Sequence, residues 1–196
     1  MSLLKRIQGK NNLDAEDKIP LQARDFLEEK FDKYVDLKAK LHKEVIDKID
    51  ETETKQGDLQ GPKLAAVANE IILSLLERDA VFLPFSERQV IASEIMDEVV
   101  GLGPIQPLIA NDDITEIMVN GPKQVYVELK GRLYLTNAKF RDDDHVLHII
   151  DKIVSPIGRR IDEGQPYVDA RLRDGSRVNA IIPPLALNGP TITIRK

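Results

Sequence analysis

The sequence predicts an α+β protein, in which a bundle of three helices precedes a mostly antiparallel sheet with helices on one of its faces. Three observations lead there. Before Gly101, apolar residues recur every three or four positions, as on one side of a helix. After Gly101, the apolar spacing changes to two, which is typical of strands. The length of 196 residues suits one domain or two small ones. The absence of cysteine excludes disulfides and thiolate metal sites.

The predicted bundle begins with an amphipathic helix between Pro20 and Asp50, whose apolar residues form one stripe. The polar segment Glu51–Lys63 contains two glycines and a proline and is predicted to be a loop. A second helix is expected to bury the apolar residues of Leu64–Leu75. The segment Ser86–Gln89 has the pattern of a capping box and predicts a third helix that runs to Val100.

The second half predicts a short helix at Pro104, a strand hairpin around Lys130 and Gly131, and a helix that begins after the acidic run Asp142–Asp144. A second pair of strands is expected around Asp174 and Gly175. The predicted strands cover residues 115–119, 124–129, 132–135, 167–172, 177–182 and 191–195. Strands followed by a helix and more strands favour an antiparallel sheet that has its helices on one face.

Charge separates the two halves. The whole chain has 28 basic and 33 acidic residues, for a net charge of −5. Residues 1–98 carry 15 bases and 21 acids, whereas residues 99–196 carry 13 and 12. From Ser155 onward, six of the seven bases are arginine, whose planar guanidinium holds phosphate or carboxylate through two hydrogen bonds. The mild acidity argues against a nucleic-acid partner, and neither a membrane-spanning run nor a secretory leader is expected.

Several catalytic and metal-binding motifs can be weighed. The segment Gly57–Lys63 has the wrong spacing for a phosphate-binding loop, so the chain is not expected to hydrolyse a nucleotide by itself. His145 and His148 could face the same way on a helix, but ordinary histidines are the better interpretation. The run Asp142–Asp144 lacks the glycine and distal glutamate of a calcium loop and is better explained by helix capping.

Arginines concentrate near the second predicted hairpin. Arg171 and Arg173 share one strand face, and Arg177 opens the paired strand. A bound polyphosphate would explain this clustering. Salt bridges at the surface, with Asp169 as one of several available acids, explain it equally well from the pattern alone.

Four segments carry a resemblance to the secretion and pilus-assembly motor ATPases: Gly101–Ile105, Ile114–Gly121, Gly158–Glu163 and Asp169–Pro184. Within that family the sequence is most similar to the CpaF branch, the tight-adherence (Flp pilus) relatives of the type II and type IV secretion ATPases. The resemblance covers about residues 86–196. It divides the chain into a helical region, residues 1–85, and an α/β domain, residues 86–196, that opens with the third bundle helix.

The resemblance implies that the α/β domain is PAS-like and is the N-terminal domain of a longer motor ATPase, so that the chain would lack a RecA-like C-terminal domain. That domain would bind ATP and Mg²⁺, with neither tightly bound to the present residues. It further implies that Arg171 and Arg177, and less clearly Arg195 and Arg160, contact the nucleotide phosphates. The implied assembly is a hexamer in the cytoplasm, peripheral to the inner membrane through platform proteins.

A different function class stays open beside this one. The chain could be a self-contained sensor or adapter, whose sheet binds a small ligand or a protein partner. An independent hydrolase has almost no support, because the phosphate-binding loop is missing and no Ser/His/Asp set is marked in the sequence.

Overall fold

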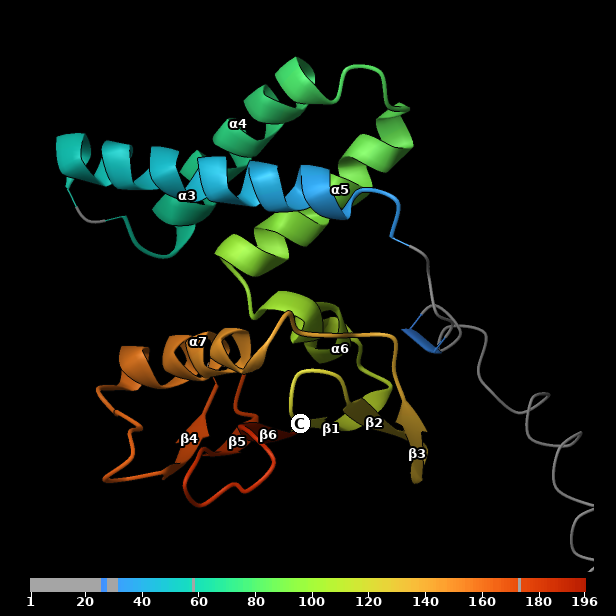
Figure 1. Cartoon of the computed structure of the whole chain (residues 1–196), viewed down its shortest axis with the longest axis vertical. Helices are drawn as coiled ribbons and strands as arrows, with labels where there is room; N and C mark the ends of the chain where they lie inside the picture. Colours follow the sequence, from blue (N-terminus) through green and yellow to red (C-terminus); the bar gives the residue numbers. More distant parts are fainter. Residues whose placement is uncertain (1–25, 28–31, 58, 173) are drawn as a thin grey trace, which may run out of the picture.

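The structure is a computed structural model that describes residues 26–27, 32–57, 59–172 and 174–196. The helical bundle lies at one end of the molecule and the β-sheet at the other (Figure 1). Helices α6 and α7 lie between them. The predicted α+β class, with three bundle helices followed by an antiparallel sheet, is confirmed.

Three helices form the bundle: α3 (Val35–Gln56), α4 (Pro62–Asp79) and α5 (Phe85–Val99). Their apolar stripes meet in a core of their own. Its buried helical members are Leu41, Val45, Ile49, Ala68, Ile72, Leu75, Leu76, Ile91, Ile95 and Val99. Most of the stability of such helices comes from packing their amphipathic faces, so the three helices stabilise one another.

The bounds of the first helix differ from the prediction at both ends. A single helix from Pro20 is wrong, because Asp32–Tyr34 are not helical and Leu27 packs against the core of the sheet domain instead. Residues 1–25 lie outside the described part. At the other end α3 continues six residues into the predicted loop and ends at Gly57, which has a φ of +86°. These six residues are polar but compatible with a helix, so their polarity does not indicate a loop.

The capping box predicted at Ser86 is also wrong. Helix α5 begins one residue earlier, at Phe85, and its N-cap residue Pro84 makes no side-chain cap. Pro84 has an extended conformation, with φ −54° and ψ 148°, which leads directly into the first helical turn. Ser86 therefore lies inside the helix.

The sheet has six strands, all antiparallel to their neighbours, in the order β3-β2-β1-β6-β5-β4. The strands are β1 (Ile114–Asn120), β2 (Val125–Leu129), β3 (Arg132–Leu135), β4 (Tyr167–Arg171), β5 (Arg177–Ile181) and β6 (Thr191–Arg195). Two meanders, β1-β2-β3 and β4-β5-β6, join through the pairing of β1 with β6. The first and last strands of the domain are therefore at its centre.

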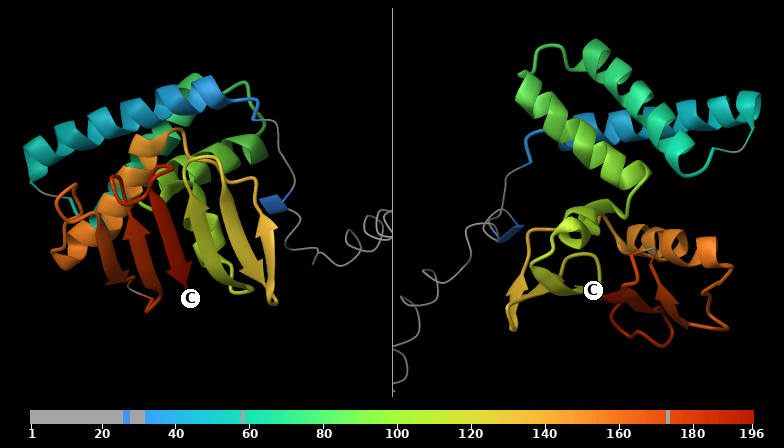
Figure 2. Two further views of the ribbon diagram at one scale, coloured as in Figure 1. Left: turned by 60° about the horizontal axis from the view of Figure 1, so that its bottom comes forward. Right: turned by 180° about the vertical axis from the view of Figure 1, so that it is seen from behind.

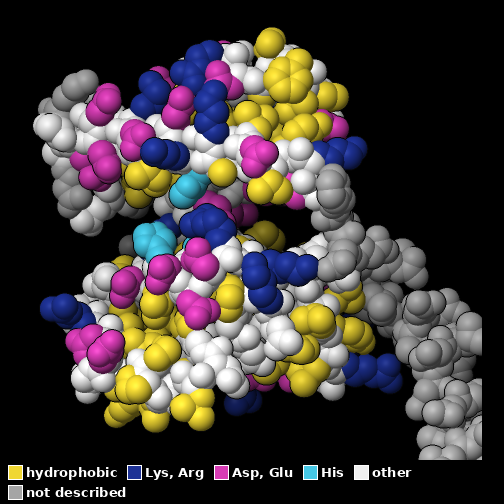
Figure 3. All heavy atoms as spheres, in the orientation of Figure 1, with side chains coloured by type: hydrophobic (Ala, Val, Ile, Leu, Met, Phe, Trp, Pro, Cys, Tyr) yellow, Lys and Arg dark blue, Asp and Glu magenta, His cyan; other side chains and the backbone are white. Residues whose placement is uncertain are grey.

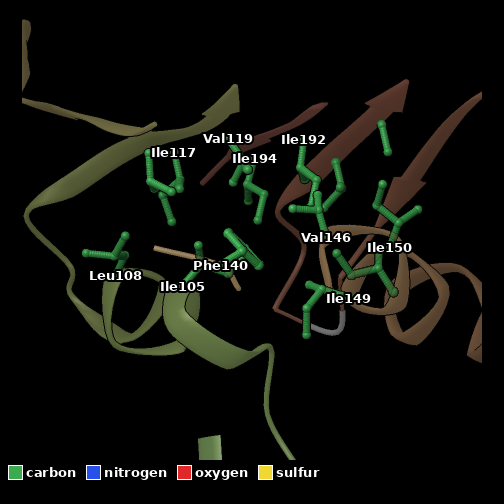
Figure 4. Packing of buried hydrophobic residues seen from close by; sticks show 14 of the residues in the cluster. Ile105, Leu108, Ile117, Val119, Phe140, Val146, Ile149, Ile150, Ile192 and Ile194 are labelled. Atoms are coloured by element: carbon green, nitrogen blue, oxygen red, sulfur yellow. The ribbon is translucent and has the colours of Figure 1, made fainter. Parts of the chain in front are cut away.

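One face of the sheet is covered by the 3₁₀ turn η2 (Gly103–Ile105) with α6 (Gln106–Ala110), and by α7 (Asp143–Val154), which runs into the 3₁₀ turn η3 (Ser155–Ile157). Figure 4 shows strand and helix side chains pointing toward one another in this core. The labelled members are Ile105, Leu108, Ile117, Val119, Phe140, Val146, Ile149, Ile150, Ile192 and Ile194. The helix predicted after the acidic run is confirmed, since the Asp142 side chain accepts a hydrogen bond from the His145 backbone N–H at 2.8 Å.

Lys152 on α7 joins the bundle to the sheet domain. Its Nζ donates hydrogen bonds to the backbone oxygens of Glu98 at 2.6 Å, Val99 at 3.1 Å and Gly101 at 3.3 Å. The last carbonyls of α5, which have no partner within the helix, are thus satisfied by α7. By packing, α5 belongs with the bundle core. The boundary at residue 86 follows the extent of the sequence resemblance and stays a prediction.

Within the described ranges, no helix has the length and apolar character needed to cross a membrane.

Candidate functional site

Among the residues that the structure describes, no helix covers the second face of the sheet (Figure 2, left). Side chains alternate along each strand, so the residues that do not enter the core lie on this open face. On β4, for example, Val168 and Ala170 are buried, whereas Tyr167 and Arg171 are exposed. The open face is therefore where polar side chains from several strands can act together.

The strand register brings three predicted arginines side by side. Arg171 is paired with Arg177, and Arg177 is paired with Arg195. We call these three residues the arginine row. Directly opposite residues on neighbouring strands have Cβ atoms roughly 4.5–5.5 Å apart, and like charges in such positions destabilise a sheet. The row therefore concentrates positive charge on the open face.

The same line of residues becomes acidic on the other half of the sheet. Glu116 on β1 is paired with Arg195, and Glu128 on β2 is paired with Glu116. Although Glu116 is opposite Arg195 in the register, neither Arg195 nor Arg171 has an ion-pair partner within 4.0 Å among the described residues. Both guanidinium groups are exposed and available to an anion.

Arg177 is held by Asp169. Its Nε lies 3.1 Å from both carboxylate oxygens, and its Nη2 also contacts Oδ2. The hydrogen bond from Arg177 is the main reason that the pKa of Asp169 is lowered, with further contributions from the charges of Arg177, Arg159 and Arg171. The same hydrogen bond raises the pKa of Arg177. The pair is exposed, so solvent screens it.

A turn fixes the register of the first two arginines. The Asp174 carboxylate accepts hydrogen bonds from the backbone N–H and the hydroxyl of Ser176, both at 2.9 Å. Gly175 follows with a φ of +95°, a conformation that glycine adopts without strain. The local sequence therefore determines that Arg171 and Arg177 are opposite each other.

The other predicted arginines are not part of the strand register. Arg160 is in the exposed segment before β4 and is not in a strand, so the register does not bring it to the row. Arg173, predicted to share a face with Arg171, lies outside the described residues. Sequence reasoning underrated Arg195, which is at the end of the row, and did not single out Asp169 as the partner of Arg177. The alternation along β4 was the signal that could have indicated Asp169.

A second group of ionisable residues lies where the bundle meets the sheet domain. Nε2 of buried His145 is 2.9 Å from Oε2 of Glu98, without the alignment of a regular hydrogen bond, and Arg141 Nη1 is 3.7 Å from the same oxygen. Burial raises the pKa of Glu98, but the contact with His145 and the nearby positive charges outweigh it and lower this pKa overall. Burial lowers the pKa of Lys152 and of His42.

The ionisable residues at this junction are best explained by a structural role. Figure 3 shows histidine side chains on the walls of the hollow between the two parts. His145 contacts a carboxylate, and burial lowers the pKa of His148. No group of three or more potential metal ligands occurs within the part of the chain that the structure describes.

The bundle exposes apolar side chains at the turn between α4 and α5, visible as the yellow area at the top of Figure 3. Val81, Phe82 and Phe85 are 70%, 73% and 67% exposed. A shallow groove of about 350 Å³ beside them is lined by residues of both helices, including Leu73 and Arg88. It lies on the bundle, whereas the arginine row lies on the far face of the sheet.

Chemically, the arginine row can bind an anion and stabilise negative charge. Guanidinium groups donate several hydrogen bonds in one plane and match phosphate oxygens well. Three such groups in one line suit a polyphosphate better than a single carboxylate. The row presents no side chain suited to transfer a proton, so we assign it a binding and charge-stabilising chemistry.

Comparisons with known proteins agree with the motifs. The family model described as type II/IV secretion system protein matches residues 98–196, which contain the whole sheet and α7. A Mycobacterium tuberculosis protein named "Putative conjugal transfer protein" is 29% identical over 107 residues, covering 52% of this chain and 30% of its own length. An uncharacterized protein of Methanocaldococcus jannaschii is 36% identical over 138 residues, covering 63% of this chain and 19% of its own length.

Among solved structures, the VirB11 ATPase of the Brucella suis type IV secretion system, in complex with sulphate, has a TM-score of 0.42 and 26% identity. That match covers 47% of this chain and 29% of the other. The chain spans less than a third of the length of each of these three relatives. Because the family model covers half of the chain, including every strand of the sheet, the chain belongs to the family of type II/IV secretion system proteins.

Proposed function

We propose that this chain is the non-catalytic N-terminal region of a secretion or pilus-assembly motor ATPase of the Flp (tight-adherence) type. The observation that carries the proposal is the arginine row, in which Arg171, Arg177 and Arg195 are adjacent on an open sheet face. Two of the three have no ion-pair partner among the described residues, so the row has positive charge to offer an anion.

In this proposal the row faces the nucleotide phosphates held by a RecA-like domain of the same protein. The guanidinium groups stabilise the charge that develops on the γ-phosphoryl group during its transfer. The row supplies arginine donors only, and the described segments lack the glycine-rich loop of backbone N–H groups that cradles a triphosphate. ATP and Mg²⁺ are therefore expected to be held mainly by the other domain, and a contact of Arg160 with the phosphates stays a prediction.

The wider assembly follows from the same proposal. Closure of the two domains around ATP in a hexameric ring would drive extrusion of pilin subunits. The ring would act in the cytoplasm, where it docks on platform proteins of the inner membrane. The exposed apolar residues between α4 and α5 are available for such a contact.

Turnover of the full-length protein tests the proposal. Arg171→Ala and Arg177→Ala are each expected to lower kcat by about 100-fold or more, since an arginine at the transferring phosphate contributes at least that much. Arg132→Ala is the matched control, because Arg132 is an exposed arginine of the same sheet at its far edge. Unfolding midpoints of all variants should agree. Unchanged turnover in the row variants would reduce these arginines to surface charges and favour the adapter alternative.

Residues 1–196 by themselves are proposed to lack ATPase activity and to bind ATP weakly. Calorimetric titration of this chain with ATP checks this, and a micromolar Kd would contradict it. The reading frame beyond Lys196 gives an independent test. A Gly-x-x-x-x-Gly-Lys-Ser/Thr motif within a few tens of residues supports the motor proposal, and a stop codon would refute it.

A further inference from the structure

We propose that Asp169 is the internal counter-ion of the arginine row, from which an incoming phosphate group must displace Arg177. This proposal rests on the anion-binding role of the row. It adds that the affinity of the row for phosphate is set by competition with a carboxylate of the same sheet.

The register places Asp169 beside the row without making it part of the row. Asp169 is on β4, two residues before Arg171, and therefore on the same face. Its own partner across the ladder is Asn179 on β5, two pairs further along than the pair Arg171–Arg177. Arg177 contacts Asp169 diagonally, through Nε at 3.1 Å from both oxygens and through Nη2.

That contact occupies one of the two edges through which the guanidinium can grip an anion. Nε with one Nη forms this edge and the two Nη groups form the other, and each can hold carboxylate or phosphate through two hydrogen bonds. With Nε and Nη2 directed at Asp169, Arg177 cannot present the first edge to a phosphate group without breaking the pair. The carboxylate also lies in the field of Arg159 and Arg171, whose charges help lower its pKa.

The pair is weak enough to exchange. The side chains of Arg177 and Asp169 are 67% and 43% exposed, and pairs of this kind are screened by water and salt. A triphosphate brings several negative charges and can contact Arg171 and Arg195 at the same time. Without an anion, Asp169 limits the repulsion within the row. With an anion, Arg177 turns to the phosphate and Asp169 becomes a nearby negative charge that weakens binding.

A purely structural salt bridge predicts the opposite effect of mutation. If the pair served only to fasten β4 to β5, removing Asp169 would loosen the hairpin and weaken anion binding. If Asp169 competes with the anion, removing its charge strengthens binding. The direction of the change in anion affinity therefore distinguishes a structural salt bridge from a competing carboxylate.

The experiment is a titration of residues 1–196 with inorganic triphosphate at low salt, followed by NMR of the arginine side-chain N–H groups. Asp169→Asn is expected to bind triphosphate about three- to tenfold more tightly than the unmodified chain, the range for losing an exposed pair together with its repulsion of the anion. Asp169→Glu, which keeps the charge, should stay close to the unmodified chain. Asp169→Ser is a second neutral variant, in case the amide side chain disturbs folding.

Two controls show whether the effect is local. Asp47→Asn removes the same charge from an exposed position on α3, in the bundle, and should leave the affinity unchanged. In the double variant Asp169→Asn with Arg177→Ala, the gain should disappear, because the counter-ion acts through Arg177.

The outcomes separate this proposal from the one on which it rests. If Arg177→Ala weakens triphosphate binding but Asp169→Asn does not strengthen it, the counter-ion role is overturned and the arginine row stands. If triphosphate binds with no dependence on Arg177, or if neither the unmodified chain nor Asp169→Asn binds it, both proposals fail. Tighter binding in Asp47→Asn as well would show a general charge effect and would also overturn the counter-ion role.

Discussion

The helical bundle and the open sheet face use charged residues in opposite ways. On the bundle, Lys40 Nζ of α3 lies 2.8 Å from Asp79 Oδ2 of α4, and Arg78 of α4 bridges its neighbour Asp79 and Glu44 of α3. On the open face, by contrast, Arg171 has no such partner among the described residues. Paired charges need no ligand, whereas Arg171 and Arg195, which are unpaired within the described ranges and lie on either side of Arg177, repel it at a cost that an anion can remove. The contrast supports a structural role for the charges of the bundle and the proposed anion-binding role for those of the open face.

The largest expected effect is in the core behind the open face. Ile149→Ala on α7 should lower the free energy of unfolding by about 2–5 kcal/mol, because it leaves a cavity at a fully buried position. Urea denaturation followed by circular dichroism measures it. Val90→Ala, at an exposed apolar position on α5, is the control and should change little. Equal losses from both variants would mean that burial does not decide stability here.

Next in size is the link between the two regions. Lys152→Met removes the donor for three backbone oxygens at the end of α5 and should cost about 1–3 kcal/mol, since these acceptors lose their partner. We further expect the bundle and the sheet domain to unfold in separate steps, observed by hydrogen exchange. Lys43→Met, at an exposed position on α3, is the control and should change stability little. A single unchanged transition in Lys152→Met would show that the regions are coupled by other contacts.

A smaller effect is expected from pH at the same junction. The pKa of Glu98 is lower in the folded protein than its ordinary value of 4.5. Ionised Glu98 therefore contributes fully to the stability of the fold above about pH 4.5, and this contribution is lost as the pH falls through the folded pKa. Glu98→Gln should therefore reduce the loss of stability between about pH 5 and pH 3. Glu70→Gln, at an exposed position on α4, should keep the normal acid dependence. Identical pH profiles for the unmodified chain and Glu98→Gln would contradict the role of this carboxylate.

The smallest stability effects are expected at the surface charges of both regions. Arg78→Ala and Arg177→Ala should each leave the unfolding midpoint within error of the unmodified chain, because both residues are exposed and their pairs are screened. Only Arg177→Ala should alter triphosphate binding. A clear loss of stability in Arg177→Ala would remove the contrast between the two regions.

Much of the secondary structure could be predicted because its signals are local. The apolar period changes after Gly101, and all six strands of the sheet lie after that point. The errors are at positions where local signals conflict with packing. Polar residues after Asp50 continue α3, because a helix facing solvent tolerates them until Gly57. Leu27 belongs to the stripe of the first predicted helix by spacing but packs in the core of the other domain.

The candidate site was predictable to a similar extent. The turn at Asp174 and Gly175 is short, so the pairing of Arg171 with Arg177 follows from the sequence. The position of Arg195 depends on β6 and on the face that β6 buries, which no short motif encodes. The contact between Arg177 and Asp169 depends on side-chain conformation as well as register.

The periodicity of each element, the turn that aligns two arginines and the motifs of the family can all be derived from local sequence. The position of β6 at the centre of the sheet, between β1 and β5, and the face that the described helices leave open emerge from long-range packing. Strands distant in the chain acquire their register by burying their apolar side chains together, which no local signal encodes. When Ile192 and Ile194 enter the core, Arg195 must point to the open face and complete the row.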